Sequence, residues 1–345
     1  MIKTRNLMWD NIKGFLILTV LLGHLFHTIE NTYSIGKYFS DWFYVFHMPS
    51  FIFVSGYFAK SYMKDNKVRP IKVSYLASYY ITFQLILSLI IEILKPNQKF
   101  SFFNPRLGLW YLLALIVFYL LIPLAQKVPK LVTLTFSIFM GVFVGSEISA
   151  GSFFTICRIL VFAPFFYAGY YTSEEFVYKL KNLKYHLLIG LVSIIASISL
   201  WATMVYFKGI DLTLDISYGH HNYHKMDVSF LEGAFLRLWA YLIAALMIFG
   251  LILIAPNFKT VFSRLGKNSL QIYIFHLPLI VCLQKGMLDG IVTIDTEGKT
   301  ILLLAVGFCL ALILSLKPFS YPFIWLRKFV DKIFATIDKE SSYEQ

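Results

Sequence analysis

Long apolar segments recur along the whole chain and limit it to one class of fold. A helix needs about 20 mostly apolar residues to cross a bilayer. Ten segments meet this need: 9–29, 41–60, 72–94, 108–126, 131–147, 154–172, 186–207, 232–255, 268–286 and 300–317. Only 14% of the 345 residues are charged and 58% are hydrophobic, which leaves too few charges to cover a soluble surface. The sequence predicts an all-α, polytopic membrane protein of about ten transmembrane helices, and it excludes disordered, collagen-like, coiled-coil and disulfide-rich chains.

The Lys and Arg residues predict the orientation of the chain. With a cytoplasmic N-terminus, 20 of the 31 lie on the cytoplasmic side, 8 on the opposite side and 3 within spans. This bias predicts that both termini are cytoplasmic. We expect a multi-pass protein of the cell (plasma) membrane. Topology also accounts for the net charge of +12, so no nucleic-acid partner is expected. We expect a transmembrane domain over residues 1–317 and an amphipathic cytoplasmic tail over 318–345.

The first apolar segment carries polar side chains that are costly at membrane depth. Lys13 and His24 are eleven residues apart, so they share one helix face about 16.5 Å apart along the axis. Asp10, one turn before Lys13, can pair with it. Such groups usually face a cavity, although Lys13 could instead reach the interface and His24 could bond a neighbouring helix.

Other ionisable residues fall inside predicted spans. His47 precedes Met48 and Pro49, and this proline predicts a break in helix hydrogen bonding near Val45 and Phe46. His276 also stands beside a Leu-Pro pair. For both histidines, packing and a role in a site remain open.

Arg158 and Arg237 stay charged and therefore need an anionic partner or ligand. Glu232 could pair with Arg237 within its own helix. The basic run MKDNKVRPIK, which contains Arg69, is either a topology signal or a phosphate-binding segment.

The link between the seventh and eighth spans is rich in His and Asp. In DLTLDISYGHHNYHKMD, His221 and His224 could share a helical face and bind a metal. Contact with a glycan and a plain loop are the other interpretations. We expect no metal, because Cys157, Cys282 and Cys309 also lack metal-like spacing,.

These features together suggest a ligand. A cation-lined cavity that opens to the cytoplasm, with a histidine three helical turns above a lysine, suits coenzyme A. That molecule has a charged nucleotide head and a long, nearly neutral arm that ends in the thioester. A buried, neutral His24 could then act as general base on an incoming hydroxyl.

Several motifs resemble one family. Lys13 and His24 match the R/K-X10-H signature of the acyltransferase 3 family of membrane O-acyltransferases. FHMPSFIFVSGYF at 46–58 is similar to that family's second-span motif, notably in the fucose 4-O-acetylase and capsular polysaccharide O-acetyltransferase subgroup. LGLWYLLAL at 107–115 and SLQIYIFHLPL at 269–279 resemble its later landmarks. One departure is the Lys in place of the commoner Arg, and we also expect no appended hydrolase-like domain.

The resemblance implies transfer of an acetyl group from acetyl-CoA to a hydroxyl of a cell-surface polysaccharide or its lipid-linked precursor. His24 would be catalytic, with Lys13 and Asp10 beside it. We expect Lys13, Arg69, Arg158 and Arg237 to hold the donor, and His47, Trp110 and His276 to contact substrate. The rival interpretations are a glycan transporter and a non-catalytic scaffold. The sequence leaves open whether copies of the chain form a homo-oligomer.

Overall fold

Helices account for nearly all of the described chain. The structure is a computed structural model that describes residues 6–29, 35–94, 96–97, 99–147, 153–284 and 297–343. Two short strands, β1 (Met63–Lys64) and β2 (Lys67–Val68), form an antiparallel hairpin. The helices are α1 (Leu7–Ile29), α2 (Ile35–Phe58), α3 (Pro70–Leu94), α4 (Trp110–Ala125), α5 (Lys130–Phe143), α6 (Ile156–Tyr171), α7 (Glu174–Lys181), α8 (His186–Lys208), α9 (Ile210–Tyr218), α10 (Phe230–Ile254), α11 (Val261–Lys267), α12 (Ser269–Gln284), α13 (Glu297–Leu314) and α14 (Tyr321–Tyr343).

Each of the ten predicted spans coincides with one helix. These helices are α1, α2, α3, α4, α5, α6, α8, α10, α12 and α13. Short helices that the sequence did not suggest lie between them, and local caps define two of these links. The Ser173 hydroxyl accepts a hydrogen bond from the Phe176 amide at the start of α7. Thr260 and Ser263 form a reciprocal capping box at the start of α11. Such caps satisfy amide groups that have no partner within the helix.

Pro49 does not end the helix in the second span, although it cannot donate a hydrogen bond to the Val45 carbonyl oxygen. α2 continues through Pro49 to Phe58. A proline removes one amide donor, but α2 is packed against both α1 and α6. Packing on several sides holds the segment helical, as neighbouring helices do for prolines in many membrane spans.

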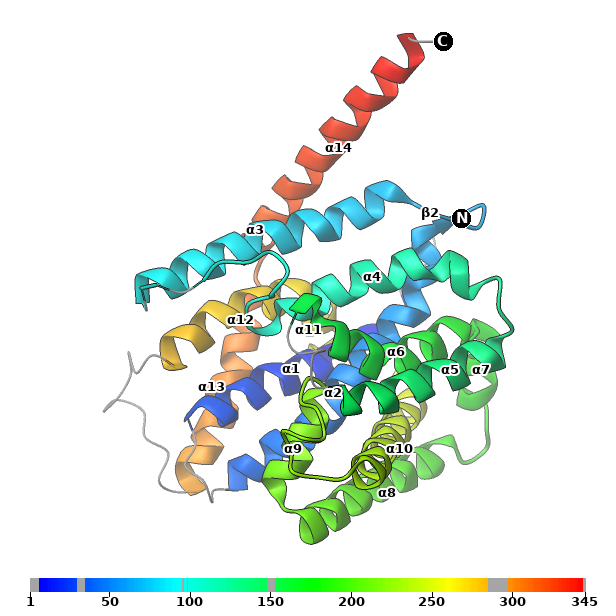
Figure 1. Cartoon of the computed structure of the whole chain (residues 1–345), viewed down its shortest axis with the longest axis vertical. Coiled ribbons are helices and arrows are strands. Elements are labelled where there is room, and N and C mark those ends of the chain that lie inside the picture. The colour runs from blue at the N-terminus through cyan, green and yellow to red at the C-terminus, as the bar shows by residue number, and fades with distance from the viewer. Residues whose placement is uncertain are drawn as a thin grey trace.

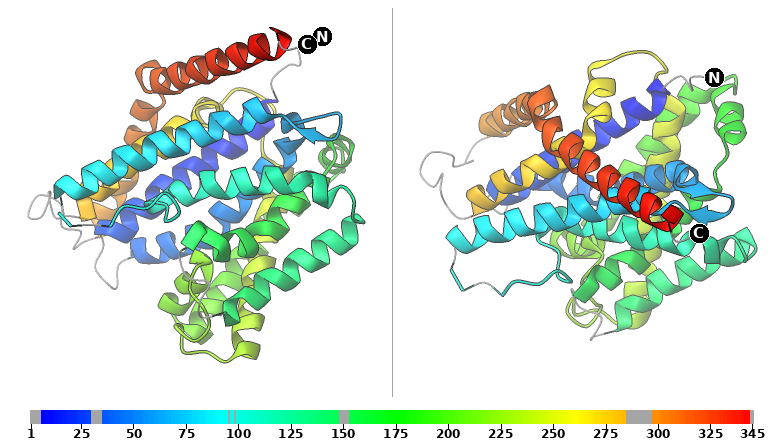
Figure 2. Two further views of the ribbon diagram at one scale, coloured as in Figure 1. Left: turned by 45° about the horizontal axis from the view of Figure 1, so that its top comes forward. Right: turned by 90° about the horizontal axis from the view of Figure 1, so that it is seen from above.

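The centre of the bundle is formed by α1, α2 and α6 (Figures 1 and 2). α10 packs against α8 and α2 on one side, and α3 packs against α4 and α14 on the other. Figure 1 shows α14 extending away from the bundle beyond α3. The central position of α1 buries Asp10 and keeps Lys13 and His24 partly buried within the bundle.

Helix length and composition support a membrane location. Among the described residues, five helical stretches are long and apolar enough to cross a bilayer: Leu7–Thr28, Pro70–Leu94, Leu107–Ala125, His186–Lys208 and Phe230–Ile254. A further pair, Thr300–Leu314 and Lys317–Thr336, qualifies only as one span bent by 62°. α8 exposes Leu188, Leu191, Val192 and Ile195, as expected of a lipid-facing helix. The protein is thus an all-α polytopic membrane protein, while ten crossings and cytoplasmic termini stay predictions.

The last helix has two different faces. Phe323, Leu326 and Val330 of α14 are buried, whereas Trp325 and Phe329 are exposed. The buried face packs against α3. The helix is amphipathic in this sense, and its position at the cytoplasmic membrane surface stays a prediction.

Candidate active site

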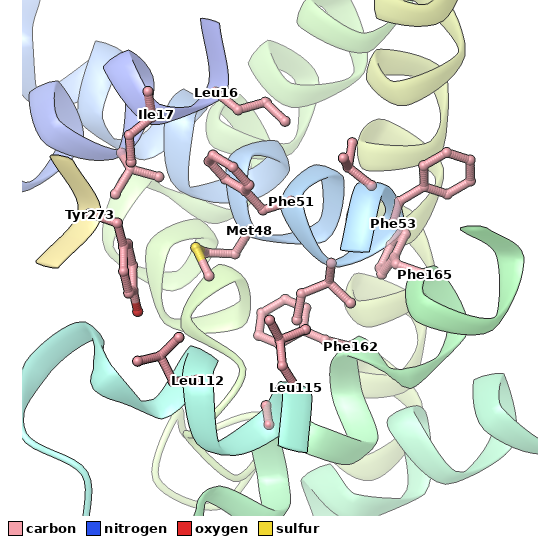
Figure 3. Close-up of a cluster of buried hydrophobic side chains, with 14 of the residues drawn as sticks. Leu16, Ile17, Met48, Phe51, Phe53, Leu112, Leu115, Phe162, Phe165 and Tyr273 are labelled. Atoms are coloured by element: carbon pink, nitrogen blue, oxygen red, sulfur yellow. The ribbon is translucent and has the colours of Figure 1, made fainter. Parts of the chain in front are cut away.

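Two cavities of about 200 Å³ each lie beside α1. The first, here called the His24 cavity, is lined by residues that include His24, Tyr44, His47, Trp110, Arg158 and Tyr218. The second, the Lys13 cavity, is lined by residues that include Lys13, Ile17, Ser55, Phe58, Tyr62 and Tyr119. Met48 and Tyr273 line both. Figure 3 shows these two side chains with Ile17 and Leu112 among the surrounding buried apolar groups.

The face of α1 that carries Lys13 and His24 therefore borders two cavities and not one. Lys13 lies in the cavity toward the start of α1, and His24 lies in the cavity toward its end. The sequence predicted a single passage along this face. Instead, Lys13 and His24 line different cavities, which share two buried side chains, Met48 and Tyr273, as lining residues.

Lys13 has the partner that the spacing predicted. Its Nζ lies 2.9 Å from Oδ1 of Asp10, one turn earlier on α1. The same Nζ is 5.7 Å from the centre of the Phe58 ring. Because Asp10 is buried and Lys13 is partly exposed, the ammonium group faces the cavity with its charge partly balanced.

His24 is connected to the protein through a tyrosine hydroxyl. Its Nδ1 lies 2.9 Å from the Tyr44 hydroxyl. The Tyr44 ring centre lies 5.0 Å from that of Tyr218, and the Tyr218 hydroxyl lies 2.9 Å from Nε2 of the exposed His27. When Nδ1–H of His24 donates to the Tyr44 hydroxyl, Nε2 of His24 remains an acceptor. A neutral histidine held in this form is suited to general-base chemistry.

The other two predicted histidines lie close to His24. The His276 ring centre is 5.3 Å from that of His24, and the His47 ring centre is 5.0 Å from that of Tyr44. Nδ1 of His276 lies 3.1 Å from the Ile272 carbonyl oxygen. Nε2 of His276 and Nδ1 of His47 are buried and have no hydrogen-bond partner among the described residues. His47 lines the His24 cavity, whereas His276 is fully buried behind it.

Arg158 and Trp110 form a pair at the wall of the His24 cavity. The Arg158 guanidinium carbon lies 4.9 Å from the centre of the Trp110 ring. Its Nε donates to the Tyr218 carbonyl oxygen at 3.2 Å, and its Nη2 lies 3.1 Å from Nδ1 of His220. Arg158 is thus placed with His24 rather than with Lys13.

The remaining two predicted donor-binding residues line neither cavity. Arg69 is exposed beside the β1–β2 hairpin. Arg237 is buried on α10, and its Nη1 donates to the Ile216 carbonyl oxygen of α9 at 2.7 Å. Glu232 pairs with Lys208 and not with Arg237.

The His-rich link is divided between two environments. His220 contacts Arg158 at the His24 cavity. His221 binds Asp215 at 2.8 Å and Lys225 at 3.0 Å. Within the described ranges, no three His, Cys, Asp or Glu side chains form a metal-binding group.

Sequence reasoning missed Tyr44 and Tyr218. Tyr44 precedes His47 by three residues on α2, so it shares a face with a histidine that was singled out. That spacing was a usable signal. Tyr218 ends α9, a short helix within the link, and nothing in the sequence pointed to its contact with α1.

Comparison with known proteins agrees with the motifs. A family model described as an acyltransferase domain matches residues 6–317, nearly the whole chain. The chain belongs to the acyltransferase 3 family. Its long apolar helices agree with a membrane protein of this family.

One curated relative shares a short segment with this family member. The nodulation protein NolL of Sinorhizobium fredii (strain NBRC 101917 / NGR234) is 38% identical over 60 residues, which cover 16% of each chain. No solved structure matches the chain.

Proposed function

We propose that this acyltransferase moves an acetyl group from acetyl-CoA on the cytoplasmic side to a hydroxyl of a cell-surface polysaccharide or its lipid-linked precursor. We place it in the plasma membrane. The observation that carries the proposal is the pair of cavities at opposite ends of α1, which share Met48 and Tyr273 as walls.

The Lys13 cavity is of a size to admit the narrow pantetheine arm of coenzyme A but not its nucleotide head. A volume of about 200 Å³ is less than the roughly 300–1,000 Å³ of most ligand sites. The pantetheine arm would enter it while the nucleotide head stays at the mouth. Lys13 supplies a positive charge there for an anionic group of the donor.

His24 carries the chemistry in this proposal. The acceptor hydroxyl oxygen attacks the thioester carbonyl carbon, and Nε2 of His24 takes the hydroxyl proton. The carbon–sulfur bond then breaks, and the same proton passes from His24 to the departing thiolate. The products are the acetyl ester and free coenzyme A, with no net change in protons. Tyr44 positions the ring by its contact with Nδ1.

Hydrolysis and transfer of a labelled acetyl group test this function. Purified protein with acetyl-CoA labelled in the acetyl group should release labelled acetate slowly and should label a hydroxyl acceptor faster. His24→Ala should lower both rates about 100-fold or more, the usual range for loss of a general base. Unchanged rates in His24→Ala, with normal O-acetylation of the cell surface, would refute the assignment. A glycan transporter would show neither reaction.

A further inference from the structure

Arg158 differs from the other two intramembrane cations of the sequence. Lys13 has Asp10 as a partner, and Arg237 lies outside both cavities. Arg158 lines the His24 cavity. No carboxylate of the described residues lies within ion-pair distance of it.

The groups that do touch Arg158 do not balance its charge. They are a carbonyl oxygen, the Trp110 ring and the His220 imidazole. Burial and, to a smaller extent, the nearby Arg158 lower the pKa of His220 to about 3. His220 is therefore neutral at physiological pH and acts as an acceptor for the guanidinium.

A guanidinium with a net charge in an acid-free, partly enclosed cavity favours an anionic ligand. Arg does not lose its proton in proteins, and an unpaired charge in a low-dielectric site is costly. Its planar fork fits carboxylate and phosphate groups through two parallel hydrogen bonds. The contacts to Trp110, Tyr218 and His220 hold the fork in place before any ligand arrives.

The ligand of this site must share the cavity with His24. Tyr218 lies beside both residues, because its carbonyl oxygen accepts from Arg158 while its ring centre is 5.0 Å from that of Tyr44, the partner of His24. An anion held at Arg158 would therefore be fixed relative to the base.

We propose that Arg158 binds an anionic group of the acceptor, a carboxylate or a phosphate, and so places the acceptor hydroxyl at His24. This inference rests on the proposed function. The same chemistry could come from an acidic sugar of the glycan or from the phosphate of a lipid carrier. A different role, stabilising the oxyanion of the transfer step, would need Arg158 in every reaction of the thioester.

Two reactions of the purified protein separate these roles. Arg158→Gln should lower transfer at least tenfold more than it lowers acetyl-CoA hydrolysis, because water as the acceptor needs no anchor. It should lower kcat/KM for transfer to the surface glycan of the host cell at least tenfold, mainly through KM. Arg158→Lys should recover part of the loss. Arg264→Gln, an exposed arginine on α11, is the matched control and should leave both reactions unchanged. A parallel fall of hydrolysis and transfer in Arg158→Gln would overturn the proposal.

Altered acceptors test the same proposal without any mutation. Wild-type protein is given the glycan in its lipid-linked form, after release from the lipid, and after chemical reduction of its carboxyl groups. Loss of at least tenfold in kcat/KM on release identifies the phosphate as the anion, and the same loss on reduction identifies the carboxylate. Equal transfer to all three forms would overturn the inference while leaving the proposed function intact. A wild-type protein that neither hydrolyses acetyl-CoA nor acetylates any form would overturn the proposed function as well.

Discussion

His24 is held by a tyrosine hydroxyl, where many catalytic histidines have a carboxylate partner. Tyr44→Phe removes that hydroxyl and leaves Nδ1 without its partner at 2.9 Å. We expect kcat to fall about tenfold, equivalent to ~1.4 kcal/mol, with KM for acetyl-CoA unchanged. Steady-state kinetics of the purified protein measure this. The control is Tyr241→Phe. It removes a different tyrosine hydrogen bond, from the Tyr241 hydroxyl to the Val161 carbonyl oxygen at 2.6 Å. An equal loss of kcat in both variants would mean that Tyr44 acts only on the fold.

The charge on Lys13 allows a second prediction at this scale. Lys13→Met should raise KM for acetyl-CoA about tenfold, because an anionic group of the donor loses its counter-charge. Lys13→Arg should stay close to wild type, since the positive charge beside Asp10 remains. Lys13→Met also removes the ion-pair partner of Asp10. The double variant Lys13→Met/Asp10→Asn removes both charges and so controls for this effect. A rise in KM in Lys13→Arg as large as in Lys13→Met would contradict the proposal that the charge on Lys13 binds an anionic group of the donor.

Individual residues also show what a sequence can and cannot predict. The spacing of Lys13 and His24 placed both inside the protein on α1, and Asp10 paired with Lys13 as expected. The sequence treated Arg158 and Arg237 alike. Only the rotation of α6 and α10 about their axes separates them, because it aims one side chain into the cavity and the other toward α9. That rotation depends on packing between helices, which hydrophobic periodicity along one chain does not specify.

At the level of elements, two pairs of glycines set how closely the central helices pack. A methyl group on Gly56 of α2 would collide with the Phe166 carbonyl oxygen, and one on Gly169 of α6 would collide with the Phe53 carbonyl oxygen. Gly14 of α1 and Gly266 of α11 form a similar reciprocal pair. Small residues allow such close approach of backbones in membranes. The contact between α2 and α6 therefore requires glycine at both positions.

Gly56→Ala and Gly169→Ala should each lower stability by about 1–3 kcal/mol, the usual cost of overpacking. Thermal unfolding in detergent, followed by circular dichroism, should show a lower Tm for both. Gly23→Ala is the matched control, because its methyl group would meet Tyr44 at an ordinary 3.6 Å. A Tm for Gly56→Ala equal to that of Gly23→Ala would show that α2 and α6 can separate without cost.

Element prediction succeeded for long apolar segments and failed for short links. All ten predicted spans are helices, because uninterrupted apolar runs of this length allow few other structures in a bilayer,. For the segment around α9, the sequence predicts only a link between two spans, with metal binding, glycan contact and a plain loop as interpretations. A nine-residue helix with polar residues carries a weak periodic signal, yet α9 brings Ser217 and Tyr218 to the His24 cavity.

For the whole molecule, the division into two cavities predicts access from two sides. Ser217 lines the His24 cavity and Ser269 lines the Lys13 cavity, so each can be replaced by a reporter cysteine. The background would carry Ala at Cys157, Cys282 and Cys309. In intact cells, a membrane-impermeant maleimide added outside should label Ser217→Cys and not Ser269→Cys. In inverted vesicles the pattern should reverse.

The donor itself completes this last prediction. Coenzyme A added to inverted vesicles should slow labelling of Ser269→Cys at least tenfold, because its arm would occupy the Lys13 cavity. Labelling of Ser217→Cys in permeabilised cells should be much less affected, since Ser217 lines the His24 cavity and not the Lys13 cavity. Labelling of both cysteines from the same side would mean that the two cavities share one entrance. Donor and acceptor would then have to enter by the same route, and transfer across the membrane through this protein would be ruled out.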